Sequence, residues 1–537
     1  MDSPATPFHA KSRTIYEGLC NLVDLDPIHE KVSFVGLGKA IFPTPLYPAE
    51  AFSALHAAIC RVADEIWRLR TKRDLVPITI DTDSATLSPF STFLVKINGE
   101  SLMPWSAAQL PLHHVPFASF LTDFWETNDG IIYISQNFKE GLVLKLLGID
   151  MTVEAFRALS REQVQTLIAS KTRKWKSHDL EDALAKVGGC AVIPRTFAQF
   201  AGTEQGKVLL TLAPVVVEKL NSTASAPKQF CVSPVKHPIV RPLSGIRIVE
   251  LTKELAGPTV GRILAEFGAE VIRISPIGQT HIPAFLVDLN FGKWTTHINA
   301  KDPKDYALLK NLIQGADVFL QGLKWGSTEK LNLGILDILQ MVEERSVGIV
   351  YVSENCYGQR GPWSDRPGYE QLGQCMSGLV YDQARYYEKG VNGQLEPRFV
   401  PLTILDHGTG YLCALGAMTA LWKRYERGGS YNVFGSLCQT SIWLRNQGFR
   451  PDEETVALFK NFPPLPPRGN IGSPIVMPKV LQMYSAALKR AEEVSEDGPY
   501  GKVTYLGGAW SMEGIKLGFD IPTRPLGVDP PYWPSRL

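Results

Sequence analysis

Between residues 246 and 353, short apolar runs alternate with amphipathic runs, and this alternation constrains the fold more than any other feature. Helical patterns at 257–268, 303–315 and 335–344 separate runs that have the length and composition of buried strands. Those runs are IRIVEL (246–251), EVIRIS (270–275), DVFLQ (317–321) and GIVYVS (348–353). Strands that alternate with helices of this length pair in parallel. The sequence therefore predicts an α/β fold with a Rossmann-like, doubly wound parallel sheet.

The flanking regions are organised differently. Residues 49–70 have the periodicity of a helix and precede a short strand, PITID, at 77–81. A smaller α/β unit is predicted over 125–220, with strands at 131–135 and 190–193. The segment 221–242 is rich in Ser and Pro and lacks periodicity, which is typical of a linker. The Pro- and Gly-rich tail from 452 is expected to lie over a surface as extended chain.

Charge and cysteine usage exclude several classes of protein. The chain has 55 Lys+Arg against 54 Asp+Glu, so no basic field is present to hold a nucleic acid. The eight cysteines are scattered without a CxxC pair, which fits a reducing compartment and argues against a zinc ribbon. The histidines are too dispersed to indicate a metal site. We expect no metal.

Signals for cellular location were sought in apolar runs and at the two ends of the sequence. No apolar run reaches membrane-spanning length, so we expect no membrane insertion. The opening MDSPATPFHAKSRT is too polar for a secretory signal. The closing residues Ser535, Arg536 and Leu537 match the small–basic–Leu pattern of peroxisomal import signals. The sequence thus predicts a peroxisomal protein, with the cytoplasm as the alternative.

Two distant stretches share one layout. Residues 45–81 and 401–438 each contain a proline-marked entry, a helix rich in small residues, a basic helix end and a short strand. Aligned on their basic ends, Arg70 falls on Arg427 and Ala49 falls on Asp406. Amphipathic helices are common, so coincidence is the alternative to an internal duplication.

Five stretches together resemble CoA-transferase family III, the CaiB/BaiF-like proteins. They span roughly 180 residues and are specific as a set. They are VELTKELAGPTVGRILAEFGAEVIRI (249–274), LNFGKWTTHINAKDP (289–303), GADVFLQGLKWGSTEKLNLG (315–334), YGQRGPWSDRPGYEQLGQCMSG (357–378) and PLTILDHGTGYLCALGAMTALWKRYERGG (401–429). Segments within 125–220 resemble the small domain of the family.

Compared with the family, the order of the parts is rearranged, as in a fused pair whose copies kept different pieces. The resemblance implies a helix–strand remnant of a first copy at 1–110 and a small α/β domain at 111–220. After the linker 221–242, it implies a CoA-binding, Rossmann-like domain with the catalytic aspartate at 243–450. The C-terminal extended segment 451–537 is expected to pack on that large domain.

Asp406 is the first candidate catalytic residue. It stands where a helix begins, and aspartate is a favoured N-cap, so capping is the plain interpretation. The resemblance implies instead the nucleophilic aspartate of the family, which attacks a thioester carbonyl, holds the acyl group as an anhydride and then carries CoA. A carboxylate at a helix N-terminus is expected to stay ionised and therefore nucleophilic. Ala49, the residue that aligns with Asp406 in the stretch 45–81, has no carboxylate, so one active site per chain is expected.

Glu370 is the second candidate, because the resemblance places a glutamate of CoA-transferring members here. In the racemase branch of the family, a His-Asp pair occupies this neighbourhood, whereas this chain has Tyr369-Glu370. Tyrosine is a poor general base near neutral pH, since its pKa is about 10. A solvated surface carboxylate is the plain alternative for Glu370.

Candidate contacts to CoA follow from the resemblance and from local chemistry. Ala256 and Gly257 open the helix after the first strand, where glycine admits a ligand to the backbone and the helix N-terminus favours a pyrophosphate. Lys301 and Lys330 align with basic positions that contact CoA phosphates, and Lys293 is a further candidate. Lone lysines are more often simply solvated. No GxGxxG or Walker motif supports a nucleotide cofactor.

Three hypotheses remain open from the sequence. The first is a CoA transferase that moves CoA from an acyl-CoA donor to a carboxylic acid through an aspartyl-linked intermediate, with no tightly bound cofactor. The second is an α-methylacyl-CoA racemase or epimerase. The third is a non-catalytic homologue that binds acyl-CoA. The resemblance also implies association into a homodimer.

Overall fold

The fold is built around one large, mostly parallel sheet. The computed structural model describes residues 6–102, 120–136, 139–220, 240–278, 281–387, 393–401, 403–463 and 473–534. In that sheet the strand order is β11-β10-β9-β12-β13-β14-β8, and only β8 runs antiparallel to its neighbour. The strands are β8 (Val215–Leu220), β9 (Arg247–Leu251), β10 (Glu270–Ser275), β11 (Lys293–His297), β12 (Val318–Gln321), β13 (Val350–Asn355) and β14 (Ser430–Ser436).

This order confirms the predicted doubly wound α/β fold. In chain order the six parallel strands lie as 3-2-1-4-5-6, which is the arrangement of dinucleotide-binding folds. The order reverses between β9 and β12, so the crevice for a ligand is expected at their carboxyl ends. The predicted strands at 246–251, 270–275, 317–321 and 348–353 are confirmed as β9, β10, β12 and β13.

Eight helices accompany the strands of this sheet in the described ranges from 256 to 446. Their starts follow local chemistry: Asp302 accepts the N–H groups of Lys304 and Asp305, and Pro303 occupies the first turn of α13. The helices of this unit are α11 (Ala256–Glu266), α12 (Pro283–Leu289), α13 (Pro303–Gln314), α14 (Ile335–Met341), α15 (Glu370–Ser377), α16 (Leu379–Ala384), α17 (Ile404–Arg427) and α18 (Leu437–Asn446). A short 3-10 turn, η5 (Glu329–Leu331), lies before α14.

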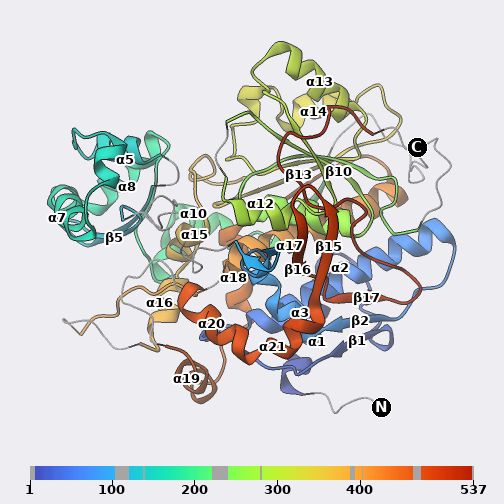
Figure 1. Cartoon of the computed structure of the whole chain (residues 1–537), viewed down its shortest axis with the longest axis horizontal. Helices are drawn as coiled ribbons and strands as arrows, with labels where there is room; N and C mark the ends of the chain where they lie inside the picture. The colour runs from blue at the N-terminus through green and yellow to red at the C-terminus, as the bar shows by residue number, and fades with distance from the viewer. Residues whose placement is uncertain are drawn as a thin grey trace.

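The N-terminal part packs against this unit through one long helix. Its helix α2 contacts α17, where the Tyr411 hydroxyl lies 3.1 Å from His56 Nε2 and the Tyr411 ring packs edge-on against Phe52. The strand β17, from the far end of the chain, pairs with β2 (Figure 1). The elements are α1 (Pro7–Leu22), β1 (Val32–Val35), α2 (Pro48–Thr71), β2 (Ile78–Asp81), α3 (Thr82–Leu87), η2 (Ser88–Phe90), α4 (Ser91–Leu94) and β17 (Trp510–Met512).

The helices α2 and α17 have matching surroundings. Each has 24 residues and is the last helix before the second of two parallel strands, β1 and β2 in one case and β13 and β14 in the other. In each case the second strand also pairs with an antiparallel neighbour, β17 or β8. The first helical hydrogen bonds, from Ala51 to Tyr47 and from His407 to Thr403, set the register. By that register Glu50, rather than the expected Ala49, occupies the helix position of Asp406.

The small α/β unit has its own hydrophobic core and projects to one side of the molecule (Figure 1). An antiparallel sheet of β5, β6 and β7 carries helices on one face. The elements are β5 (Asp123–Glu126), β6 (Ile131–Ser135), α5 (Glu140–Leu146), α6 (Val153–Arg157), α7 (Arg161–Thr172), α8 (Ser177–Lys186), β7 (Cys190–Val192), α9 (Phe197–Gly202) and α10 (Glu204–Leu209).

The C-terminal segment is less extended than expected. Three helices precede a hairpin that pairs with β3, because a cluster of acidic residues at 452–454 and apolar periodicity beyond it favour helix. The elements are β3 (Lys96–Ile97), β4 (Glu100–Ser101), α19 (Asp452–Lys460), α20 (Ser473–Met483), α21 (Ser485–Ala491), β15 (Glu492–Gly498) and β16 (Gly501–Leu506). Irregular chain follows β17, as predicted for the tail.

Two expectations concern residues beyond the described ranges. Nearly all of the predicted linker, at 221–239, and the tripeptide Ser535–Leu537 lie outside them. Within the described ranges, the longest helices are too polar or too short to cross a bilayer.

Removing Arg450 is expected to destabilise the fold strongly. Its guanidinium makes two contacts to the buried Glu50 carboxylate, at 2.6 and 2.5 Å, and both side chains are shielded from water. Arg450→Met leaves that charge buried without its partner, which costs about 3–5 kcal/mol. The free energy of unfolding in urea measures the loss.

The exposed pair Lys207–Glu204 supplies the control, since Lys207→Met should change stability by less than about 1 kcal/mol. Equal effects of the two substitutions would contradict the assignment of Arg450 as the compensating charge.

Candidate active site at two helix N-termini

Asp406 lies in the first turn of α17. It is not the N-cap, since Thr403 holds that position and donates its hydroxyl to the Pro89 carbonyl instead of capping the helix. Leu405 and His407 on either side are buried, whereas Asp406 keeps some contact with solvent. The plain capping interpretation therefore does not account for this carboxylate.

Glu370 meets Asp406 through the backbone. As the first residue of α15, Glu370 accepts the Asp406 N–H on Oε2 at 2.7 Å and the Leu405 N–H on Oε1 at 3.2 Å. The Gln374 side chain donates to Oε1 at 2.8 Å. Glu370 is buried, which excludes the solvated-surface interpretation. The structure thus brings together the two residues that the sequence nominated as catalytic.

The surroundings of this site raise the pKa of both carboxyl groups. Burial raises the pKa of Glu370 to about 7, although its three N–H donors favour the ionised form. Burial also raises the pKa of Asp406 well above its ordinary value, and the nearby carboxylates of Glu370, Glu354 and Glu254 raise it further. From the sequence, the helix N-terminus was expected to keep Asp406 ionised. Burial and the neighbouring carboxylates oppose this effect, and the sequence does not show that they lie close to Asp406.

Glu354 occupies the helix N-terminus at Gly257, where a CoA pyrophosphate was predicted to bind. This buried residue lies near the end of β13, and the Gly257 N–H at the start of α11 donates to its carboxylate. A Cβ on either Gly257 or Gly322 would collide with Glu354 Oε1. These glycines therefore make room for a protein carboxylate, and a pyrophosphate would have to displace it. Burial raises the pKa of Glu354 to about 7.

Glu254 is held in a strained conformation on the loop between β9 and α11. Its φ of +61° falls in the left-handed region, which non-glycine residues seldom adopt. Among the described residues, neither of its shielded oxygens accepts a hydrogen bond, and an ion pair with Lys253 at 3.3 Å partly offsets its charge. Strain and an unsatisfied buried carboxylate are typical of functional sites.

Glu254 and Glu354 were not among the site residues predicted from the sequence. A signal was present, because each glutamate follows a predicted apolar strand of the parallel sheet, at the edge where ligands bind. Only the fold places them within electrostatic reach of Asp406.

The residues predicted to bind CoA differ in their access to solvent. Lys293 is buried inside the domain, 2.7 Å from Glu250 Oε2, and donates to the Pro258 carbonyl, so its ammonium does not face a ligand. Lys301 and Lys330 are exposed, the first beyond the carboxyl end of β11 and the second in η5. Ala256 and Gly257 are buried at the start of α11.

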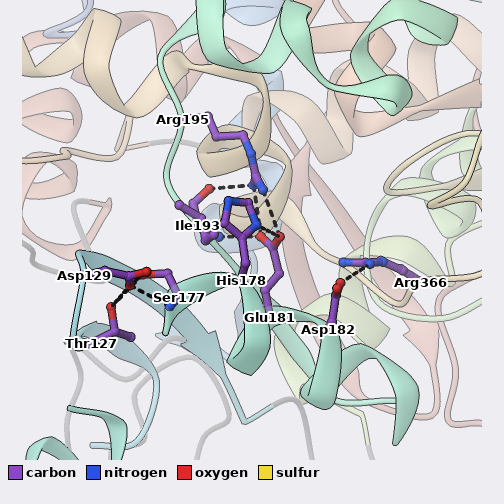
Figure 2. A network of polar contacts seen from close by, with 9 residues as sticks. All are labelled: Thr127, Asp129, Ser177, His178, Glu181, Asp182, Ile193, Arg195 and Arg366. Carbon is purple, nitrogen blue, oxygen red and sulfur yellow. Dashed lines mark hydrogen bonds and ion pairs between the residues drawn. The ribbon is translucent and has the colours of Figure 1, made fainter. Parts of the chain in front are cut away.

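The small unit grips the segment that leads to Glu370 (Figure 2). Glu181 of α8 receives two hydrogen bonds from Arg195, at 3.0 and 2.8 Å, and one from the Ile193 N–H. Asp182 on the same helix receives one from Arg366, at 2.6 Å. The Arg195 N–H donates to the Cys375 carbonyl in α15. The helix of Glu370 is thereby held from outside the large domain.

Comparisons with known proteins identify the family that this chain resembles. The sequence pattern of CoA-transferase family III matches residues 243–455, which include Asp406 and Glu370. An acyl-CoA transferase of Gibberella moniliformis is 32% identical over 422 residues, covering 76% of this chain and 72% of the relative. The acetyl-coenzyme A transferase nodX of Hypoxylon pulicicidum is 29% identical over 545 residues, covering 96% and 90%. A human succinyl-CoA:glutarate CoA-transferase is 33% identical over 216 residues, covering 38% and 47%.

The raised pKa of Glu354 has a consequence for stability. Because the folded protein binds this proton more tightly than the unfolded chain, the Glu354 contribution to stability falls as pH rises from about 4.5 to 7. Glu354→Gln cannot titrate, so between pH 5 and pH 8.5 its stability should rise by on the order of 2–3 kcal/mol relative to the wild type. Urea unfolding at both pH values measures this difference.

Glu218→Gln is a suitable control, because that carboxylate is only half-buried and pairs with Arg360 at the surface. A stability difference between wild type and Glu354→Gln that is independent of pH would show that folding does not raise the pKa of Glu354.

Proposed function

The chain belongs to CoA-transferase family III and is an enzyme that transfers coenzyme A, and we propose that Asp406 is the residue that carries the transferred groups. The observation that supports this role is the contact at 2.7 Å between the Asp406 N–H and Glu370. It fixes a partly accessible carboxylate at a buried junction of two helices, inside the segment that matches the family.

The proposed reaction conserves atoms and needs no redox partner. The Asp406 carboxylate attacks the thioester carbonyl of the donor, the C–S bond breaks, and the CoA thiolate leaves behind a mixed anhydride. The thiolate then attacks the Asp406 acyl carbon, which releases the donor acid and leaves an aspartyl-CoA thioester. Attack by the acceptor carboxylate and return of the thiolate to the acceptor acyl carbon give the new acyl-CoA and restore Asp406.

The surrounding residues divide the remaining tasks. Glu370 holds the backbone of the Asp406 turn, so that the nucleophile keeps its position while its own charge is consumed and restored. Glu354 and Glu254 raise the pKa of Asp406, which makes the acyl-Asp406 state, without that negative charge, more favourable in this site. A thioester and an anhydride are both neutral at the reacting carbonyl, which suits such an acidic site.

The substrates are an acyl-CoA and a carboxylic acid, which fit the family. We assign CoA contacts to the exposed Lys301 and Lys330, and to the backbone at Ala256 and Gly257 once Glu354 yields its place. Lys293 is left out, because its ammonium is buried against Glu250. No tightly bound cofactor enters this scheme.

The matching surroundings of α2 and α17 support an internal duplication. In this interpretation, residues 1–110 retain the helix–strand part of a first copy, and Arg450 neutralises Glu50, the residue at the helix position of Asp406. The chain would then contain one working site, as expected from the sequence. Association of two such chains into a homodimer belongs to the same proposal.

Loss of the Asp406 carboxylate should abolish transfer. Asp406→Asn keeps the size of the side chain but removes the nucleophile, and exchange of label between a CoA thioester and free acid should fall by at least about 10⁴-fold. Mass spectrometry of quenched wild-type enzyme should find an acyl or CoA adduct on the peptide that contains Asp406.

Asp382→Asn provides a matched control, because this buried aspartate pairs with Arg445 away from the two helix N-termini. Normal exchange by Asp406→Asn would overturn the assignment. Incubation of a 2-methylacyl-CoA in heavy water separates the racemase alternative, which predicts deuterium at the α-carbon without CoA transfer.

We also propose a peroxisomal location on the basis of Ser535–Leu537. A fluorescent protein fused to the N-terminus of the chain should appear in peroxisomes of yeast cells, and deletion of these three residues should disperse it through the cytoplasm. Deletion without any change in distribution would contradict the tripeptide as the signal.

A further inference from the structure

Gln374 links Glu370 to the chain segment that enters the Asp406 helix. Its Nε2 donates to Glu370 Oε1 at 2.8 Å and to the Val400 carbonyl at 3.4 Å, and its Oε1 accepts the Val400 N–H at 2.9 Å. The side chain is buried and lies one helical turn after Glu370 on α15. One amide therefore contacts the carboxylate and the backbone on which the nucleophile depends.

The orientation of this amide is fixed by its partners. The oxygen and nitrogen of a glutamine amide are easily interchanged, but a backbone N–H only donates and a carbonyl only accepts. The two bonds to Val400 therefore place the Gln374 nitrogen toward Glu370. A donor in this position favours the ionised form of Glu370, which is the form that accepts the N–H groups of Leu405 and Asp406 most strongly.

The segment that Gln374 holds has anchors on both sides of it. Before Val400, the Phe399 ring stacks on Phe124 at 5.2 Å and meets Tyr133 edge-on, which ties it to the small unit. After Val400, the Thr403 hydroxyl donates to the Pro89 carbonyl of the N-terminal part. Gln374 is thus the contact that relates this segment to Glu370 itself.

We infer that Gln374 is a positioning residue for CoA transfer, acting through Glu370 to hold the backbone turn of Asp406. This inference rests on the proposed function. It concerns the orientation of the nucleophile and not the binding of CoA, because Gln374 lies among protein groups. Loss of the residue should therefore lower kcat and leave the KM for acyl-CoA nearly unchanged.

The test compares Gln374→Met with Gln383→Met. Methionine has the length of glutamine without its amide, and Gln383 is another buried glutamine, whose amide donates to the Pro43 carbonyl. In Gln374→Met, kcat should fall roughly a hundredfold, as expected when a reacting group is displaced by about 1 Å. In Gln383→Met it should change less than about threefold, with a similar loss of thermal stability.

The pH profile separates positioning from general destabilisation. Loss of the Gln374 donor raises the pKa of Glu370 above about 7, so more of Glu370 stays protonated at neutral pH. The acidic limb of kcat should therefore move to higher pH in Gln374→Met and stay in place in Gln383→Met. Gln374→Glu, which keeps the shape but adds a like charge, should fall further in kcat as pH rises.

A double-mutant cycle completes the experiment. If Gln374 acts through Glu370, adding Gln374→Met to Glu370→Gln should cause little further loss of kcat. Wild-type kcat and pH profile in Gln374→Met, or fully additive losses in the cycle, would overturn the inference. Transfer by Asp406→Asn would instead overturn the proposed function, and so the two failures are distinguishable.

Discussion

The contact between Glu370 and the backbone of Asp406 is the interaction on which the proposed active site depends. Three N–H groups, two from the first turn of α17 and one from Gln374, converge on a single buried carboxylate. A carboxylate shared in this way offsets part of the cost of its own burial and also fixes the relative position of α15 and α17. The position of the proposed nucleophile is therefore set by a junction of two helices and not by one loop.

The rest of the molecule supports that junction from three sides. The small unit holds α15 through the contact of Arg195 with the Cys375 carbonyl and stacks on Phe399. The N-terminal part packs α2 against α17 and accepts the Thr403 hydroxyl. The parallel sheet brings Glu354 to the start of α11. Parts of the chain that are far apart in sequence thus contribute to one site.

Much of the architecture was predictable, because it depends on local patterns. The strands at 270–275 and 317–321 and the helix at 49–70 were located within one or two residues, since apolar periodicity and helix-end chemistry are written in neighbouring residues. The C-terminal helices α19–α21 were missed, because proline and glycine around them obscure short periodic runs. The predicted alignment of α2 with α17 was wrong by one residue, because the basic residues at the helix ends do not determine where the first helical hydrogen bond forms.

By itself, the sequence determined the doubly wound sheet, the family of the chain and the pairing of Asp406 with Glu370 as candidates, since these follow from periodicity and from motifs of adjacent residues. Only the tertiary structure decided that Lys293 is buried against Glu250, that Glu354 reaches the start of α11 and that Glu254 lies close enough to raise the pKa of Asp406. The physical reason is that burial and electrostatic coupling depend on which strands lie side by side. Residues 257, 354 and 406 are separated by many elements in the chain, and the order of the strands brings them to one edge.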